Sequence, residues 1–320
     1  METTNRVWLC TQVLFRMSRP LQLVSIVLVY VLGLLIAAAT GITINSTAAI
    51  LGLIVILPIS MSIHYANEYA DHETDALTKR TPFSGGSGAL AESGLPPHIA
   101  LVAAWVSLLI GSGVALVGWL WGLLPYPALG VLVFGAFFGW MYSMPPLKLA
   151  WRGWGELTNA SLGGVLLPVY AYTIQSGQVD LMIILACMPF GLLAFNNLLA
   201  TQWADRSADS QVGKRSLAIL WSTSKLRLTY TGVAAASYLI LLTLRGTVYP
   251  EVVVWGSLLV LPISVWGGIM FTRQHSPFPA VAAMVLMLLV QMVGWYLVSK
   301  RIFYPRVWEP GLQLAYIIIS

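Results

Sequence analysis

Charged side chains are scarce in this chain: Asp, Glu, Lys and Arg make up 9% of its 320 residues, whereas hydrophobic residues make up 58%. Soluble globular domains carry about 25% charged residues, and the mean hydropathy here is +0.80. This composition excludes an ordinary soluble domain and predicts an integral membrane protein. The net charge of +5 is explained by topology and lipid headgroup contact, so we expect no nucleic-acid partner.

Cysteine is nearly absent, with only Cys10 and Cys187 in the chain. Neither belongs to a Cys-x-x-Cys or Cys/His pattern, which argues against a disulfide framework and against a zinc site. The polar first 19 residues contain no short apolar core followed by a small-residue cleavage site. We therefore expect no cleavable signal, and we expect the first apolar stretch to direct membrane insertion.

Long apolar stretches are abundant instead, and nine of them can cross about 30 Å of hydrocarbon as helices. They are residues 20–41, 46–67, 98–118, 125–143, 156–174, 181–202, 227–244, 251–271 and 280–299. Gly163, Gly164 and Pro168 interrupt the fifth stretch. The sequence predicts an all-α membrane protein in which residues 1–320 form one domain, a bundle of nine transmembrane helices around a central cavity.

Basic residues are concentrated on one side of this predicted bundle. If the N-terminus lies on the same side as every loop after an even-numbered span, that side holds 13 of the 17 basic residues. They are Arg6, Arg16, Arg19, Lys79, Arg80, Lys148, Arg152, Arg206, Lys214, Arg215, Lys225, Arg227 and Arg273. The positive-inside rule makes this face cytoplasmic, in what we expect to be a bacterial cell membrane. Lys300, Arg301 and Arg306 are exceptions, which either a further membrane segment from Val307 to Ser320 or a basic outer tail would explain.

Two acidic clusters follow apolar stretches at matching places. Asn67, Asp71 and Asp75 are spaced four residues apart, and so are Asp205 and Asp209. A spacing of four stacks side chains on one face of a helix. Hard oxygen ligands that leave room for phosphate oxygens suit Mg²⁺. We therefore predict that these five residues bind magnesium and that the four aspartates are catalytic, whereas Glu68 and Glu73 point away from the stripe and have supporting or solvated positions.

Basic and aromatic side chains follow the two clusters on the same face. The pairs Lys79/Arg80 and Lys214/Arg215 come shortly after the clusters, and a third loop adds further candidates. The predicted diphosphate-binding residues are Asn67, Arg80, Lys148, Arg152, Lys214 and Tyr142. Two loops, 71–97 and 205–225, are longer than a connection requires, and we expect short helices there that cap the cavity. The glycine-rich stretch in the first loop fits either a backbone anion nest or an ordinary turn.

The clusters also divide the chain into similar halves. The second predicted span ends in the first cluster, and the sixth span ends in the second cluster. This pattern predicts pseudo-repeated halves, about 1–150 and 151–320, that place the clusters opposite each other across a shared cavity.

A prenyl diphosphate suits these parts because it is a polyanion at one end and a hydrocarbon at the other. Mg²⁺ would stabilise the charge on the leaving group as the allylic C–O bond breaks. An ion-coupled transporter is the main alternative, since repeats and membrane carboxylates also build carriers. The clusters lie at helix ends on one face, whereas a carrier needs ionisable groups near mid-membrane. A purely structural role would leave the charged face unexplained.

Three motifs resemble those of the UbiA superfamily of intramembrane aromatic prenyltransferases. Residues 67–75, NEYADHETD, resemble its signature NDxxDxxxD, with Glu68 in place of the usual Asp. Residues 205–209, DRSAD, followed by GKRSL at 213–217, are similar to its second signature, DxxxD with a trailing GKRTL. Residues 142–148, YSMPPLK, and 152–156, RGWGE, look like its YSxPPxKLxxRGxGE stretch.

The resemblance implies a ring of nine helices that carries out Mg²⁺-dependent ionisation of a polyprenyl diphosphate, followed by attack of an aromatic carbon. It assigns the five cluster residues to metal and diphosphate binding, and Arg80, Lys148 and Lys214 to phosphate contact. It implies membrane lipid as the surroundings. The sequence itself indicates no obligate protein partner. The family often has Asn four residues before the second signature, where this chain has Thr201, so Asn197 or Gln202 could take that place.

The stretch KRTPFSGGSG at residues 79–88 looks like the branch that prenylates 1,4-dihydroxy-2-naphthoate in menaquinone synthesis. We therefore expect this acceptor. The alternatives are other acceptors of the same superfamily, namely 4-hydroxybenzoate, homogentisate, chlorophyllide or a lipid.

Overall fold

A computed structural model describes residues 2–77 and 86–302 of the chain. Within these ranges the regular structure is helical, apart from an isolated bridge between Arg245 and Tyr249. The predicted all-α class is confirmed. Arg80 and the segment Val307 to Ser320 lie outside the described residues, so the predictions made for them stay predictions.

Eight helices in the described part are long and apolar enough to cross a membrane. They are α2 (Pro20–Ala39), α3 (Ser46–Ala70), α6 (His98–Leu120), α7 (Tyr126–Ser143), α10 (Leu181–Gln211), α12 (Thr223–Thr243), the consecutive pair α13 (Glu251–Leu258) and α14 (Leu261–Met270), and α15 (Phe278–Ser299). These eight correspond to eight of the nine predicted stretches.

The fifth predicted stretch is helical as well, but in three consecutive pieces: α8 (Gly155–Asn159), the π-helix η2 (Ala160–Leu166) and α9 (Leu167–Ser176). Pro168 has no backbone N–H to donate within a helix, and π-helical turns accommodate such irregularities. A count of nine spans stays a prediction.

Small residues let this irregular segment pack tightly on α10. A Cβ added to Gly164 would lie 2.5 Å from the Cα of Gly191. Lipid tails provide no hydrophobic driving force between helices, so close backbone approach at small residues is a main source of helix association in membranes. The contact fixes the position of α10, which carries the second acidic cluster.

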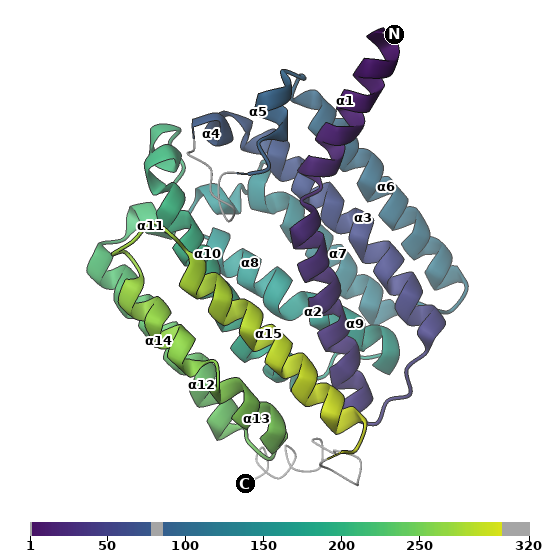
Figure 1. Cartoon of the computed structure of the whole chain (residues 1–320). Helices are drawn as coiled ribbons and strands as arrows, with labels where there is room; N and C mark the ends of the chain where they lie inside the picture. The colour runs from purple at the N-terminus through teal and green to yellow at the C-terminus, as the bar shows by residue number, and fades with distance from the viewer. Residues whose placement is uncertain (1, 78–85, 303–320) are drawn as a thin grey trace.

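The long helices close into one bundle (Figure 1). Helix α2, the first long apolar helix, packs against both α9 and α15, the last. Helix α3 packs against α6 and α7, while α10 packs against α12 and α15. Fully buried side chains in the main core include Leu32, Ile36, Ile183 and Trp295. A groove of about 500 Å³, lined by residues such as Tyr238 and Val265, lies between α12 and α14; the central cavity stays a prediction.

Short helices gather at one end of the bundle. They are α4 (His72–Leu77), α5 (Ala89–Ser93) and α11 (Leu217–Leu220), at the end where α1 (Glu2–Met17) projects (Figure 1). Both long loops thus contain short helices, as expected, whereas the side of the membrane that they face stays a prediction. Helix α1 was not predicted, yet its Val13 and Met17 are buried in a cluster with Tyr65 and Leu90. This small core anchors α1 and α5 over the end of α3.

Candidate functional site

The first acidic cluster lies where α3 passes into α4. Helix α3 ends at Ala70, and Asp71 is its C-cap. The backbone N–H of Asp71 still donates to the carbonyl of Asn67 (2.9 Å), and that of Asp75 donates to the carbonyl of Asp71 (2.8 Å). Helical spacing therefore continues across the boundary, and the amide Nδ2 of Asn67 donates to Oδ2 of Asp71 at 2.7 Å.

The second cluster lies on α10, which continues as a helix to Gln211, beyond the apolar stretch. Asp205 and Asp209 are therefore one turn apart on the same helix. The chain then turns at Gly213, whose φ of +78° favours glycine. The backbone N–H of Lys214 donates to the carbonyl of Asp209 at 3.0 Å, which returns the Lys214 side chain toward the cluster.

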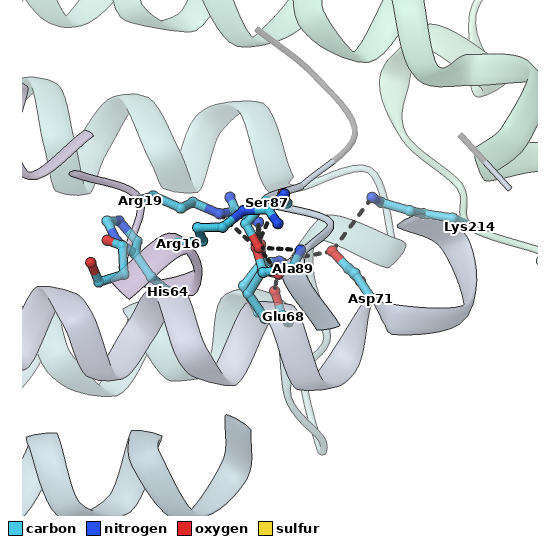
Figure 2. Close-up of polar contacts among 11 residues, drawn as sticks. Arg16, Arg19, His64, Glu68, Asp71, Ser87, Ala89 and Lys214 are labelled. Atoms are coloured by element: carbon cyan, nitrogen blue, oxygen red, sulfur yellow. Dashed lines mark hydrogen bonds and ion pairs between the residues drawn. The ribbon is translucent and has the colours of Figure 1, made fainter. Parts of the chain in front are cut away.

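Lys214 connects the two clusters. Its Nζ lies 3.3 Å from Oδ1 of Asp209. It also lies 3.8 Å from Oδ2 of Asp71, the contact drawn in Figure 2. The distance between those two carboxylate oxygens therefore cannot exceed the sum of their distances to the Nζ of Lys214. Burial alone would lower the pKa of Lys214, but the charges of Asp71 and Asp209 outweigh burial and raise it. The fold thus brings together acidic residues from opposite halves of the sequence around a permanent cation.

Asp75 is the last residue of the first cluster and lies on α4. Helix α4 packs against α10. The Asp75 carboxylate lies against Gly86, where any Cβ would collide with it. Burial, followed by the charges of Asp71 and Glu68, raises the pKa of Asp75 to about 7 despite the opposing effect of Arg19. A bound divalent cation would lower the pKa of Asp75 again, because the cation favours the charged carboxylate.

A tryptophan that the sequence did not single out joins this network. The indole Nε1 of Trp151, in the 3-10 helix η1 (Leu149–Trp151), donates to Oδ1 of Asp71 at 2.8 Å. The Nζ of Lys148 lies 5.1 Å from the centre of the Trp151 ring. The predicted phosphate ligand Lys148 is therefore adjacent to the network. Tyr142 is near enough to interact electrostatically with Lys214, whereas Arg152 is exposed.

Glu68 has a supporting position, which is one of the two expected for it. It is 2% exposed and pairs with Arg19, whose Nε and Nη2 donate to its Oε1 at 2.9 and 2.7 Å (Figure 2). The backbone N–H and the hydroxyl of Ser87 also donate to Glu68, at 2.9 and 2.6 Å. Here the glycine-rich stretch binds a carboxylate of the protein itself.

Arg19 also orients Asn67. Its Nη2 donates to Oδ1 of Asn67 at 2.7 Å, while Nδ2 of Asn67 donates to Asp71 and, at 2.8 Å, to the hydroxyl of Ser143. All polar atoms of the Asn67 side chain thus have protein partners. Two sequence features could have pointed to a role for Arg19. They are its place among the basic residues of one face and the departure from the family signature at Glu68.

The donors in this network suit a hard divalent cation. Among the described residues, no three His, Cys, Asp or Glu side chains form a ready-made metal cluster. Oδ2 of Asp209 is nevertheless buried without a hydrogen-bond partner, and it lies on the same carboxylate that Lys214 contacts. Buried carboxylates need a compensating charge, and carboxylate oxygens are the ligands that Mg²⁺ prefers. The residues therefore fit a magnesium ion that brings further oxygen ligands with it.

Comparison with known proteins gives consistent matches. The profile of the UbiA prenyltransferase family matches residues 26–290. The chain is 24% identical over 213 residues to 1,4-dihydroxy-2-naphthoate octaprenyltransferase of Bacillus subtilis, a match covering 65% of this chain and 66% of that protein. It is 27% identical to the enzyme of the same name from Mycobacterium tuberculosis (59% and 63% covered). It is 25% identical to chloroplastic chlorophyll synthase of Arabidopsis thaliana (54% and 45%). The aligned regions cover less than two thirds of the length of each of these three relatives.

Solved structures show the same fold. A UbiA homologue from Archaeoglobus fulgidus bound to GPP and Mg²⁺ aligns with a TM-score of 0.64 at 16% identity, over 90% of this chain and 99% of that one. A structure of digeranylgeranylglyceryl phosphate synthase aligns with a TM-score of 0.65 at 15% identity and the same coverage.

Proposed function

Because the chain belongs to the UbiA prenyltransferase family, we propose that it transfers a polyprenyl group from a polyprenyl diphosphate to a small aromatic acceptor, with Mg²⁺. The observation that carries this proposal is the meeting of Asp71 and Asp209 around Lys214. A diphosphate leaving group requires carboxylates that bind its cation and an ammonium group that contacts its phosphate oxygens.

We assign magnesium binding to Asp71, Asp75, Asp205 and Asp209, with Asn67 holding Asp71 in place. When bound, magnesium supplies Lewis-acid stabilisation of the negative charge that develops on the diphosphate. Lys214 and Lys148 neutralise the remaining charge, and Arg80 would add to them from the loop outside the described residues. The allylic C–O bond breaks and its electron pair leaves on the diphosphate. A ring carbon of the acceptor forms the new C–C bond to the prenyl group, and that carbon then releases H⁺ to water or to the departing diphosphate, which restores the aromatic ring.

The acceptor we propose is 1,4-dihydroxy-2-naphthoate, which would place the reaction in menaquinone synthesis. Support comes from the bacterial relatives of that name and from the KRTPFSGGSG stretch. A tetrapyrrole acceptor is the second candidate, because chlorophyll synthase also matches the chain. We place the active site at the cytoplasmic face, where the basic residues are concentrated.

The test is turnover by purified protein in lipid nanodiscs with Mg²⁺, a labelled polyprenyl diphosphate and a panel of aromatic acceptors. We expect diphosphate release together with prenylated 1,4-dihydroxy-2-naphthoate. Asp71→Ala and Asp209→Ala should each lower turnover by about 100-fold or more, because the developing charge loses its stabilisation. Glu73→Ala is the matched control, since Glu73 is exposed on α4.

Diphosphate release with none of the acceptors would remove the enzyme assignment, as would equal turnover in the two aspartate variants. Ion-coupled substrate uptake into sealed vesicles, in the same preparation, would favour the transporter instead.

A further inference from the structure

The segment 148–156 contacts Asp71 of the first acidic cluster and the backbone of residues 215–217, which follow the second cluster. We infer that two of its residues, Trp151 and Glu156, are positioning residues that hold Lys214 at the site. We call this segment the bracket. It contains η1 and the start of α8. The inference rests on the proposed function, because it gives Lys214 a diphosphate to bind. It adds two side chains to which the predicted chemistry assigned no role.

On one side, the bracket is attached to the first cluster. The Trp151 indole donates to Oδ1 of Asp71, and Asn67 donates to the other oxygen, Oδ2. These two bonds fix the plane of the carboxylate. Lys214 approaches the same Oδ2. The orientation that Trp151 imposes on the Asp71 carboxylate therefore determines where the Lys214 ammonium meets this oxygen.

On the other side, the bracket holds the backbone that carries Lys214. The carbonyl of Trp151 accepts from the N–H of Arg215 at 3.2 Å, and Oε1 of Glu156 accepts from the N–H of Leu217 at 3.0 Å. Because the N–H of Lys214 itself donates to Asp209, three successive contacts define the path of residues 214–217. Glu156 is 0% exposed, so water cannot replace its bond to Leu217.

Close packing leaves this arrangement little freedom. Gly153, with φ of +80°, lies against the Lys214 loop: an added Cβ would be 2.9 Å from Leu220 Cδ1 and 3.4 Å from the carbonyl oxygen of Arg215. A buried backbone N–H that loses its acceptor carries the full cost of an unpaired donor, so the Leu217 N–H holds to the Glu156 side-chain oxygen whether or not that group is charged. The bracket therefore sets the separation between Asp71 and Lys214.

Four variants test the inference. Trp151→Phe removes the indole N–H and keeps an aromatic ring, whereas Trp154→Phe is its control because Trp154 is 57% exposed in the same segment. Glu156→Leu removes the acceptor for Leu217. Glu156→Gln keeps a carbonyl oxygen at that place and should rescue the loss, since positioning needs an acceptor and no charge.

The first readout is acylation of the Lys214 amine by an N-hydroxysuccinimide ester, followed by mass spectrometry, with the exposed Lys225 as internal reference. The Lys214 side chain is only 13% exposed, so we expect slow acylation in the unchanged protein. Trp151→Phe and Glu156→Leu should accelerate acylation of Lys214 relative to Lys225, because the loop is released. Trp154→Phe and Glu156→Gln should leave it unchanged.

The second readout is calorimetric binding of inorganic pyrophosphate in Mg²⁺. Loss of a supporting hydrogen bond should weaken affinity by about 10-fold in Trp151→Phe and Glu156→Leu alone. Unchanged acylation in those two variants would overturn the inference, as would a Glu156→Gln protein that behaves like Glu156→Leu. If Glu156→Leu does not fold, Trp151→Phe decides. Failure of the unchanged protein to bind pyrophosphate counts against the proposed function, while the acylation result still decides the bracket.

Discussion

At the scale of single residues, the site depends on side chains that support the aspartates. Glu68 and Arg19 form an ion pair in which Glu68 is 2% exposed. Breaking a buried ion pair costs more than the pair contributes, because one charge remains buried without its partner. Arg19 also orients Asn67, and Glu68 accepts a hydrogen bond from Ser87. Loss of the ion pair should therefore also disturb the side chains of the first cluster.

Glu68→Ala should therefore lower the free energy of unfolding by about 3 kcal/mol. The Arg16–Glu92 pair is the internal control, since its side chains are 48% and 54% exposed, and Glu92→Ala should cost about 0.5 kcal/mol. Equilibrium unfolding of both variants in the same mixed micelles measures the difference. Similar losses in the two variants would show that the Arg19–Glu68 pair is as solvated as the surface pair.

Lys148→Ala should raise the apparent KM for the prenyl diphosphate while kcat changes less, because Lys148 is expected to contact the donor before and during C–O cleavage. Steady-state kinetics with varied donor and saturating acceptor gives both constants. Arg227→Ala is the comparison, since Arg227 is an exposed basic residue on α12 to which no diphosphate contact is assigned. Unchanged donor kinetics in Lys148→Ala would place Lys148 outside the phosphate site.

Sequence spacing predicted the acidic clusters and Lys214 as site residues, because the four-residue periodicity and the trailing basic pairs are local, and the structure brings Asp71, Asp209 and Lys214 together. The spacing did not select Arg19, Glu68 or Trp151. Their partners are distant in the chain: Arg19 and Glu68 are 49 positions apart, and Trp151 and Asp71 are 80 positions apart. A single sequence gives no register between such segments, so only the fold shows these contacts.

At the scale of helices, the irregular segment 155–176 determines how α10 packs. Hydropathy predicted this stretch and its interruption, and the structure shows the interruption as a π-helix that continues into α9. Apolar length identifies a span well because lipid requires internally bonded backbone. It gave no signal for α1, whose burial depends on a few side chains such as Val13 and Met17.

Gly164→Ala should destabilise the protein by about 2 kcal/mol, because a methyl group there meets the backbone of Gly191, which cannot move aside like a side chain. Gly163→Ala is the matched control in the same π-helix, since a Cβ there meets nothing within 4 Å. Thermal unfolding in detergent should show a lower Tm only for Gly164→Ala. Equal Tm values would mean that α10 and the π-helix separate at no cost.

At the scale of the whole molecule, the proposed active site requires one orientation of the bundle in the membrane. The closed bundle places α1, α4, α5 and α11 at the same end (Figure 1). The basic residues near this end predict that it faces the cytoplasm. The two cysteines allow a direct check, because Cys187 is buried while Cys10, on α1, is partly exposed.

A membrane-impermeant maleimide should label Cys10 in inside-out vesicles and leave it unlabelled in right-side-out vesicles. Cys187 should react only after denaturation, because it is 0% exposed. Cys10→Ser supplies the background signal. Labelling of Cys10 from the outer side would reverse the orientation and move the acidic site to the other face.

The most direct measurement of the central claim is calorimetric binding of geranyl diphosphate to the unchanged protein, Asp71→Asn and Asp209→Asn, each in Mg²⁺ and in EDTA. Because aspartates of both clusters are proposed to hold one magnesium-bound diphosphate, we expect binding to require Mg²⁺ and the affinity to fall by about 10-fold or more in each variant. Equal affinity in EDTA, or variants that bind like the unchanged protein, would contradict this claim.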